Sequence, residues 1–380
     1  MKSILVSILC ICFTSCLMVD RGTIIASDAS SSIIKKSNEV DEETIRKMIS
    51  KFGPLIYLHP DEVYLMDDPV YVLDNGVTLN WGEVRNDKDY SSLQVKRVRT
   101  VKTSSETLKE DAYSVREAIQ SLSEPSAYKY WLHIDDRMKK GSMSRAKALV
   151  RVLPFDLLTT EIQFWLFYPF NGPGRVEVCA SSKMCDDNWL KETGRHYGDW
   201  ERVSILVSNN AEELLGVYLS RHREGEAFER GDDGKYHSTK DHRKVLHFEG
   251  FGRNAHPIIY SAISSHAHYV SPGTHKYERV FSKKYGLGTA SADLFDRTDT
   301  GPGLRAYHPK GYQFISSAMP NFRVDEPDWL QYDGRWGQYE KLKDNVKFAV
   351  KAIKVFTYKE VGNGPTGPKV KKAWNESTFR

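Results

Sequence analysis

The stretch GRHYGDWERVSILVS at Gly194–Ser208 decides the fold class, because a polar start leads into a strongly alternating strand. Successive side chains of an extended strand point to opposite faces, so Asp199 and Glu201 share a face with Val203 and Ile205. That face is apolar except at its first two positions. An unpaired buried carboxylate costs several kcal/mol, so both carboxylates need a positive partner. The pattern predicts a core strand whose first residues lie at a rim and meet a cation, an arginine or a histidine cluster.

Short runs rich in Val, Ile, Phe and Tyr continue on both sides of this strand, from Ala146 onward. Turn residues such as Asn171-Gly172-Pro173 separate them, and no amphipathic helix lies between them. Such runs are typical of antiparallel strands packed as a sandwich. We therefore predict a mainly β fold, a β-sandwich of antiparallel strands with a few peripheral helices. The tail Lys341–Tyr358 fits a helix or a strand equally well. The runs are KALVRVL, EIQFWLFYPF, RVSILVS, LLGVYLS, PIIYSAI and YQFIS.

Two segments before these runs have helical spacing. Glu42–Phe52 is amphipathic and is followed by Gly53-Pro54, which ends a helix. Ser104–Leu122 also repeats its apolar residues at helical intervals. The second segment lies in a polar region, residues 86–140. We predict that this region is a helical and polar elaboration on a single β-sandwich-type domain, residues 41–380.

The first 26 residues are typical of a signal peptide, with a short positive start and an apolar run too short for a membrane span. Residues 27–40 are Ser-rich and predict a flexible leader. We expect the mature chain to be secreted or to reside in the endomembrane lumen or vacuole, with no transmembrane span. An alternative is a loose bacterial lipobox at Phe13–Cys16, which would anchor a lipoprotein at Cys16.

The charge and the cysteines narrow the class of protein further. The formal net charge is +4 over 380 residues, which gives no electrostatic reason to expect nucleic acid as a partner. Cys179 and Cys185 remain after the signal peptide. In an oxidising compartment they predict a small disulfide loop, and the alternative is two unpaired thiols. A zinc site is poorly supported, because the neighbouring residues are Asp186 and Asp187.

Histidines gather in one part of the chain, since ten of the twelve lie between His196 and His308. Several follow predicted strands, and strand ends meet at the rim of a sandwich, where loops build sites. The segment DLFDRTDTG adds carboxylates to the same part of the chain. We predict the metal ligands His196, Asp199, Glu201, His222 and His266. We predict the further ligand-binding residues His268, Asp296 and Asp299.

Mixed histidine and carboxylate ligands predict a divalent cation: calcium, magnesium or manganese if carboxylates dominate, and zinc if imidazoles do. The function we expect is an exported protein that binds this cation and, through it, a glycan or a membrane lipid head group. One alternative is a metal-dependent hydrolase in which the cation or His196 activates water. Another is a structural or trafficking-related interaction module. No nucleophile elbow, P-loop or catalytic Ser/His spacing occurs, so enzymatic activity stays open.

Six motifs occur in order between residues 164 and 368 of the chain: FWLFYPFNGPG, GRHYGDWERV, GVYLSRHREG, HPIIYSAISSHAHYVSPGTH, DLFDRTDTG and GNGPTGP. In these motifs, and in IYLHPDE near the start, the sequence resembles the vacuolar protein sorting-associated protein 62 family, roughly from Phe52 to Trp374. The resemblance implies a fold and a trafficking phenotype more than an activity. Two departures are a longer insert at Arg175–Thr193 and His268, where the family more often has Asn.

The segment GRHYGDWE is also similar to a second motif, the heptad Gly-His-Arg-His-Asp-Trp-Glu of the necrosis- and ethylene-inducing peptide-like cytolysins. Those proteins are secreted β-sandwiches whose motif holds a divalent cation that contacts sphingolipid head groups. Asp199 and Glu201 match the Asp and Glu of the heptad, and His196 matches its first His. Gly198 replaces the second His of the heptad. The similarity therefore does not imply cytolytic activity.

Overall fold

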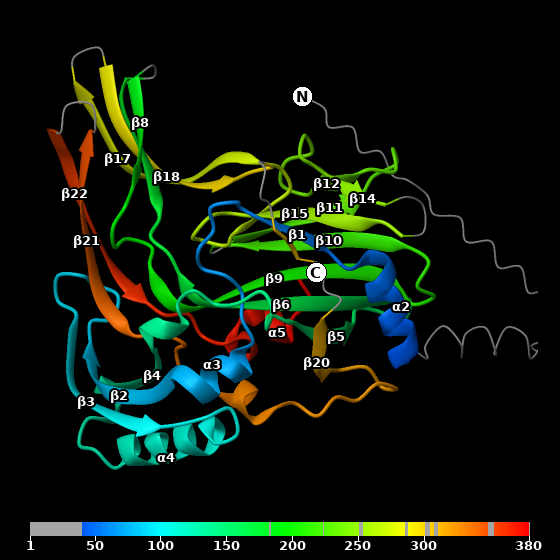
Figure 1. The fold of residues 1–380 in the computed structure, drawn as a ribbon, viewed down its shortest axis with the longest axis horizontal. Helices are drawn as coiled ribbons and strands as arrows, with labels where there is room; N and C mark the ends of the chain where they lie inside the picture. Colours follow the sequence, from blue (N-terminus) through cyan, green and yellow to red (C-terminus); the bar gives the residue numbers. More distant parts are fainter. Residues whose placement is uncertain are drawn as a thin grey trace, which may run out of the picture. The chain divides into compact units, whose positions relative to one another are not determined.

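The computed structural model describes residues 40–181, 184–222, 224–250, 254–285, 288–300, 305–307, 311–348 and 353–379 (Figure 1). The predicted signal peptide, the leader up to residue 39 and the lipobox at Cys16 lie outside the described residues, as does His308. Within the described residues, no helix has the length and apolar character needed to cross a bilayer.

An eight-stranded sheet carries the strand that begins at His196. Its order is β13-β12-β11-β10-β9-β6-β5-β20, and every pair is antiparallel except β5 with β20. Five of the six predicted runs form strands of this sheet, and the mainly β prediction is confirmed. The strands are β5 (Ala148–Pro154), β6 (Thr159–Asn171), β9 (His196–Ser208), β10 (Leu214–Arg221), β11 (Glu224–Arg230), β12 (Tyr236–Ser238), β13 (Val245–Leu246) and β20 (Tyr312–Ser317).

A five-stranded sheet and helix α2 (Glu42–Phe52) share a core with one face of the eight-stranded sheet. The predicted helix is confirmed: Asp41 caps it by accepting a hydrogen bond from the Thr44 N–H at 2.8 Å. Strand β1 pairs parallel to β15, so Ile56 lies beside Ile259. The strands are β1 (Leu55–Leu58), β14 (Phe248–Glu249), β15 (His256–Ser261), β16 (His268–Tyr269) and β19 (Arg305–Tyr307).

The opposite face of the eight-stranded sheet is also covered, which a two-layer sandwich does not require. There Trp165 and Trp200 share a core with Trp336, Trp374, helix α4 and a three-stranded sheet of order β3-β2-β4. Strand β6 is accordingly buried at every position after Thr159. The elements are α3 (Pro69–Gly76), β2 (Val77–Arg85), β3 (Gln94–Lys102), α4 (Leu108–Gln120), η1 (Pro125–Ala127), β4 (Tyr128–Ile134), η2 (Asp136–Met138), η3 (Asp328–Gln331), η5 (Pro368–Val370) and α5 (Lys372–Asn375).

A four-stranded antiparallel sheet, β17-β18-β7-β8, lies beside a hairpin formed by β21 (Tyr339–Phe348) and β22 (Ile353–Asn363) (Figure 1). Val178 and Leu294 of the sheet share a core with Val346 of the hairpin. The tail that fitted either a helix or a strand is therefore a pair of strands. The sheet consists of β7 (Arg175–Ser181), β8 (Met184–Trp189), β17 (Gly273–Tyr285) and β18 (Gly288–Thr298).

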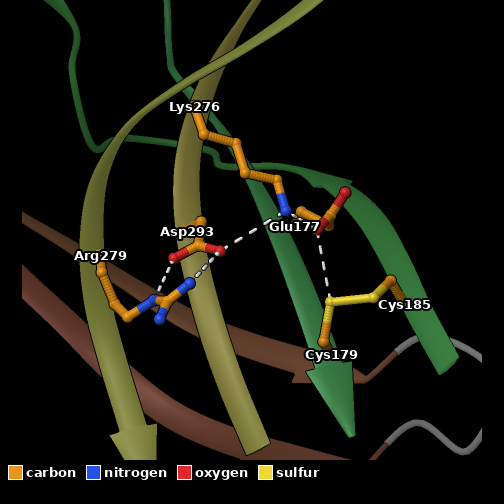
Figure 2. Close-up of a disulfide and its surroundings, with 6 residues drawn as sticks. All are labelled: Glu177, Cys179, Cys185, Lys276, Arg279 and Asp293. Atoms are coloured by element: carbon orange, nitrogen blue, oxygen red, sulfur yellow. Dashed lines mark hydrogen bonds and ion pairs between the residues drawn. A yellow bond between two sulfur atoms is a disulfide. The ribbon is translucent and has the colours of Figure 1, made fainter. Parts of the chain in front are cut away.

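The predicted disulfide joins Cys179 on β7 to Cys185 on β8, which are direct partners in the sheet with Cα atoms 4.0 Å apart (Figure 2). The Cys179 sulfur lies 3.3 Å from the Glu177 carboxylate. Because both sulfurs are bonded to each other, neither is a thiolate that could bind zinc. The bond is consistent with an oxidising, secretory-pathway compartment.

Candidate functional site

A cleft of about 1170 Å³ opens beside the start of strand β9. Strands β9 and β10 form one wall, and β17, β22 and the C-terminal residues Lys371–Ala373 contribute the others. Four of the five residues predicted as metal ligands line this cleft, and they are His196, Asp199, Glu201 and His222. Strand alternation therefore placed the two carboxylates of β9 correctly at an open rim.

Gly198 brings His196 to the same side of β9 as Asp199. Its φ is +64°, a left-handed conformation that favours glycine and interrupts the alternation of the strand. Tyr197 consequently packs with the aromatic core, where its hydroxyl bonds to Asp136. A Cβ at position 198 would lie 2.2 Å from the Trp336 carbonyl oxygen. The second histidine of the cytolysin motif therefore has no room here.

Asp199 forms a buried ion pair with His266. The Nδ1 of His266 donates to Asp199 Oδ2 at 3.0 Å, and its Nε2 donates to the Tyr64 carbonyl at 2.9 Å. Both acceptors are oxygens without hydrogens, so both ring nitrogens carry protons and the ring is cationic. Burial lowers the pKa of His266, but the hydrogen bond to Asp199 and the nearby carboxylate charges outweigh it and raise that pKa. Tyr168 stacks on the ring at 3.7 Å between centroids.

Glu62 completes the surroundings of His266, and the sequence reasoning missed it. Its Oε2 lies 3.8 Å from His266 Nε2 and accepts a hydrogen bond from the Ser264 N–H at 2.6 Å. The side chain is only 2% exposed. Glu62 is the last residue of the segment IYLHPDE, which is one of the motifs of the family resemblance. That motif could have indicated Glu62 as a site residue, but it was not assigned to the site.

The two carboxylates of β9 titrate in opposite directions. Burial raises the pKa of Asp199, but the His266 hydrogen bond and the charge of His196 outweigh it, so the pKa lies below its ordinary value. Burial and the Asp199 charge raise the pKa of Glu201 well above its ordinary value, and the Ser220 hydroxyl that bonds to it offsets only part of this rise. The strand therefore holds one ionised carboxylate and one that favours its proton.

A second imidazole–carboxylate pair lies close by. His222, which follows β10, has its Nε2 2.5 Å from Asp296 Oδ2. Asp296 also accepts hydrogen bonds from Ser265 at 2.6 Å and Tyr269 at 2.7 Å. Burial raises its pKa, but the charge and hydrogen bond of His222 prevail and lower it. Asp296 itself does not line the cleft, but His222, Ser265 and Tyr269 do.

The remaining predicted ligand residues lie elsewhere. His268 was expected to end the same strand as His266, but β15 ends at Ser261, and His268 starts β16 after a turn. It is 1% exposed and does not line the cleft. Asp299 follows β18, and its carboxylate lies 3.8 Å from His59 Nε2 rather than at the cleft.

Backbone strain accompanies both pairs. His222, Ser264 and His266 have φ values of 46°, 68° and 56°. These are left-handed conformations that residues with a Cβ rarely adopt, and they cost of order 1–3 kcal/mol each. Such residues concentrate at functional sites, where surrounding contacts hold them in place. The strain supports a functional role for this cluster.

Hydrogen bonds join two pairs of the predicted ligands, Asp199 with His266 and His222 with Asp296, and the ligand atoms do not gather around one point. Among the residues that the structure describes, one group of three His, Cys, Asp or Glu ligand atoms lies within 4.8 Å of one another, and it contains the disulfide. The cleft residues therefore do not form a preassembled metal centre. Metal binding by His196, Asp199, Glu201, His222 and His266 stays a prediction.

The buried imidazole of His268 predicts acid sensitivity. Burial lowers the pKa of His268 from 6.5 to about 4. The unfolded chain thus binds more protons between these values, and stability falls by up to about 3 kcal/mol as pH decreases from 6.5 to 4. His268→Asn should flatten this decline in urea-unfolding experiments across that range. The exposed His242→Asn is the control, and parallel pH profiles for wild type and His268→Asn would contradict the assignment.

Comparison with known proteins relates the chain to a protein family. Residues 123–378 match the family model described as vacuolar protein sorting-associated protein 62. Two Saccharomyces cerevisiae proteins are similar: the putative vacuolar protein sorting-associated protein TDA6 is 26% identical over 243 residues (61% of this chain, 46% of that protein). Vacuolar protein sorting-associated protein 62 is 27% identical over 187 residues (46% of this chain, 34% of that protein).

The chain thus spans about half the length of the first relative and about a third of the second. No solved structure matches. The matched segment contains both imidazole–carboxylate pairs and the disulfide, and it begins after Glu62. Because the family model covers well over half of the residues, the chain belongs to the vacuolar protein sorting-associated protein 62 family.

Proposed function

We propose that the cleft binds a divalent cation through Asp199 and Glu201 and, with that cation, the polar head group of a lipid or a glycan. The observation that supports this is a pair of carboxylates, each 7% exposed, that open from one strand onto the same cleft. Their Cβ atoms are roughly 6.5–7 Å apart by strand geometry, a separation at which two carboxylates share one cation.

The electrostatics give this site a specific signature. His266 already offsets the charge of Asp199, whereas Glu201 has no cationic partner among the described residues. Burial and the Asp199 charge raise the pKa of Glu201, although the charge of Lys371 lowers it in part, so Glu201 favours a proton there. A cation at Glu201 must displace this proton, because metal ligands bind in the deprotonated form. Ion binding should therefore release protons and strengthen as pH rises.

Isothermal titration calorimetry tests the site on the chelator-stripped full chain. We expect at least one of calcium, magnesium, manganese and zinc to bind, with a heat that changes between buffers of different protonation enthalpy. Glu201→Gln should weaken binding by about tenfold or more, since it removes one charged ligand. Glu278→Gln, which also lies at the cleft, should bind as wild type does.

Two results would contradict the proposal. One is the absence of binding heat for all four ions, and the other is equal affinity in wild type and Glu201→Gln. If Asp199→Ala and Glu201→Gln change only the stability of the fold, the cluster is structural and the protein is better described as an interaction module. This outcome corresponds to the second alternative from the sequence, a structural or trafficking-related interaction module.

A hydrolase is the second candidate, and the opposed pKa values of Asp199 and Glu201 favour it. Two carboxyl groups whose environments separate their pKa values are the usual arrangement of an acid and a base. Glu201 would donate a proton, and Asp199, oriented by His266, would act as the base. Turnover of glycan or ester substrates that is lost in Glu201→Gln would distinguish this function from binding.

We further propose that the protein acts in the secretory lumen, the vacuole or outside the cell. The Cys179–Cys185 disulfide supports this location, since such bonds persist in oxidising compartments. The printed names of the two yeast relatives associate those proteins with vacuolar protein sorting. This chain covers less than half of either relative, so a sorting role is a proposal here.

A further inference from the structure

Four lysines project from the outer side of the β21–β22 hairpin, and we call them the lysine face: Lys341, Lys343, Lys347 and Lys359. In β21 these exposed lysines alternate with the buried residues Leu342, Asp344 and Val346. Lys359 is the direct cross-strand partner of Lys343, so its side chain lies on the same side of the hairpin.

The lysine face is only partly neutralised within the protein, because the charge of Lys341 acts on Asp89 and the Glu192 carboxylate accepts a hydrogen bond from the Lys343 backbone N–H at 3.0 Å. Like charges directly opposite each other destabilise a strand pair. Lys343 and Lys359 lie directly opposite each other in this hairpin. None of the four lysines forms an ion pair with a described acidic side chain. Instead, the ammonium groups of Lys341 and Lys359 lie 5.8 and 5.4 Å from the ring centroid of Tyr90. Lys343 and Lys359 therefore leave a repulsion that an external anion would relieve.

The neighbouring four-stranded sheet shows the contrast. There, Lys276 bonds to Glu177, and the Arg279 guanidinium lies 2.6 Å from the Asp293 carboxylate (Figure 2). Basic side chains a short distance from the lysine face are thus paired with acids. On the lysine face, by contrast, none of the four lysines is joined to a described acidic side chain by an ion pair.

The connection between β2 and β3 lies against the hairpin. Asn363 at the end of β22 donates a hydrogen bond to the Asp87 carbonyl at 2.8 Å, which holds the β2–β3 connection against the hairpin. Strand β3 is an edge strand of its sheet, and it exposes Lys96 and Lys102 without described ion pairs. The fold therefore brings the β2–β3 connection, which carries Lys88 together with Asp87 and Asp89, beside the hairpin.

We propose that the lysine face docks on an anionic lipid bilayer. Its cations in the hairpin are all lysines, which act as point charges and attract a diffuse anionic surface. Recognition of single phosphate or sulfate groups favours the bidentate fork of arginine instead. Tyr90, between two of the lysines, is a residue type that prefers the membrane interface.

This docking is independent of the ligand in the cleft. Tyr358 and Glu360 alternate with Lys359 on β22, and both line the cleft. The cleft and the lysine face therefore lie on opposite sides of one hairpin. A protein docked through the lysines leaves the cleft accessible, so vesicle binding and ion binding fail or succeed separately.

Vesicle sedimentation of the full chain tests the proposal. We expect binding to phosphatidylcholine vesicles that contain about a third phosphatidylserine, little binding to phosphatidylcholine alone, and loss of binding at high salt. Lys343→Glu should reduce binding by about tenfold or more. The melting temperature of the variant, measured alongside, separates weaker binding from unfolding, because the new carboxylate lies opposite Lys359 and also near Glu192.

Lys235→Glu is the matched control, because it reverses one exposed charge in the β11–β12 turn. It should bind vesicles as wild type does. Equal binding by wild type and Lys343→Glu would overturn the proposal, as would equal binding to neutral and anionic vesicles. Binding to heparin or DNA that Lys343→Glu abolishes, without vesicle binding, would also overturn it and assign the face to a soluble polyanion.

Discussion

Gly198→Ala is expected to destabilise the protein by about 2–5 kcal/mol, the sum of a left-handed backbone penalty and a clash. The φ of +64° is unfavourable for alanine, and the new Cβ would lie 2.2 Å from the backbone oxygen of Trp336. That oxygen cannot move easily, because the Trp336 side chain is buried in the aromatic core. Urea unfolding monitored by tryptophan fluorescence gives the measurement.

Gly234→Ala separates the two contributions. Gly234 has a similar φ of +77°, but no heavy atom lies within 4 Å of the position of its Cβ. We expect it to cost about 1–2 kcal/mol, the backbone penalty alone. Equal losses for the two variants would show that the Trp336 contact is relieved without cost, and that Gly198 does not fix the geometry of the site.

Asp199→Ala is expected to destabilise the protein by about 3–5 kcal/mol at neutral pH, because it leaves the His266 cation buried without its counter-charge. His266→Gln should cost less, since it removes the cation. The double variant should lose less stability than the sum of the two single variants, because it has neither the carboxylate nor the imidazolium and so leaves no uncompensated charge buried. Chemical unfolding of all four proteins completes the cycle.

Additive losses would count against the ion pair. In that case Asp199 and His266 would contribute independently to the free energy of unfolding. The two hydrogen bonds of the His266 ring would then not be sufficient evidence that the ring is cationic. Calorimetry on the same four proteins links this pair to the cleft. The proposed cation site requires Asp199→Ala to lose ion affinity as well as stability, whereas a purely structural pair changes stability alone.

Local sequence patterns predicted many of the strands and part of the candidate site. Alternation in β9 placed Asp199 and Glu201 on the core face at a rim, and the position of His222 after β10 was also correct. The residues that these side chains contact from distant parts of the chain were not predictable from local patterns. Glu62 and His266 meet across about two hundred residues, and no periodicity within either segment encodes that contact.

The conformation of Gly198 also escaped sequence reasoning. A glycine inside a strand pattern signals a local irregularity, but not its direction. The burial of β6 on both faces had a visible cue in EIQFWLFYPF, since a continuous apolar run indicates a strand covered on two sides. The covering residues, Trp336 and Trp374 among them, lie far along the chain and carry no local sign of where they pack.

The parallel pairing of β1 with β15 has a consequence for biosynthesis. Leu55–Leu58 pairs with residues 258–261 and, on its other side, with Arg305–Tyr307. Strand β1 therefore has no partner until about two hundred further residues have been synthesised, and its second partner follows about fifty residues later. Because such distant pairings form slowly, the apolar side of this strand stays uncovered during much of translation. We therefore expect the nascent chain to be prone to aggregation until the segment that holds β15 has emerged.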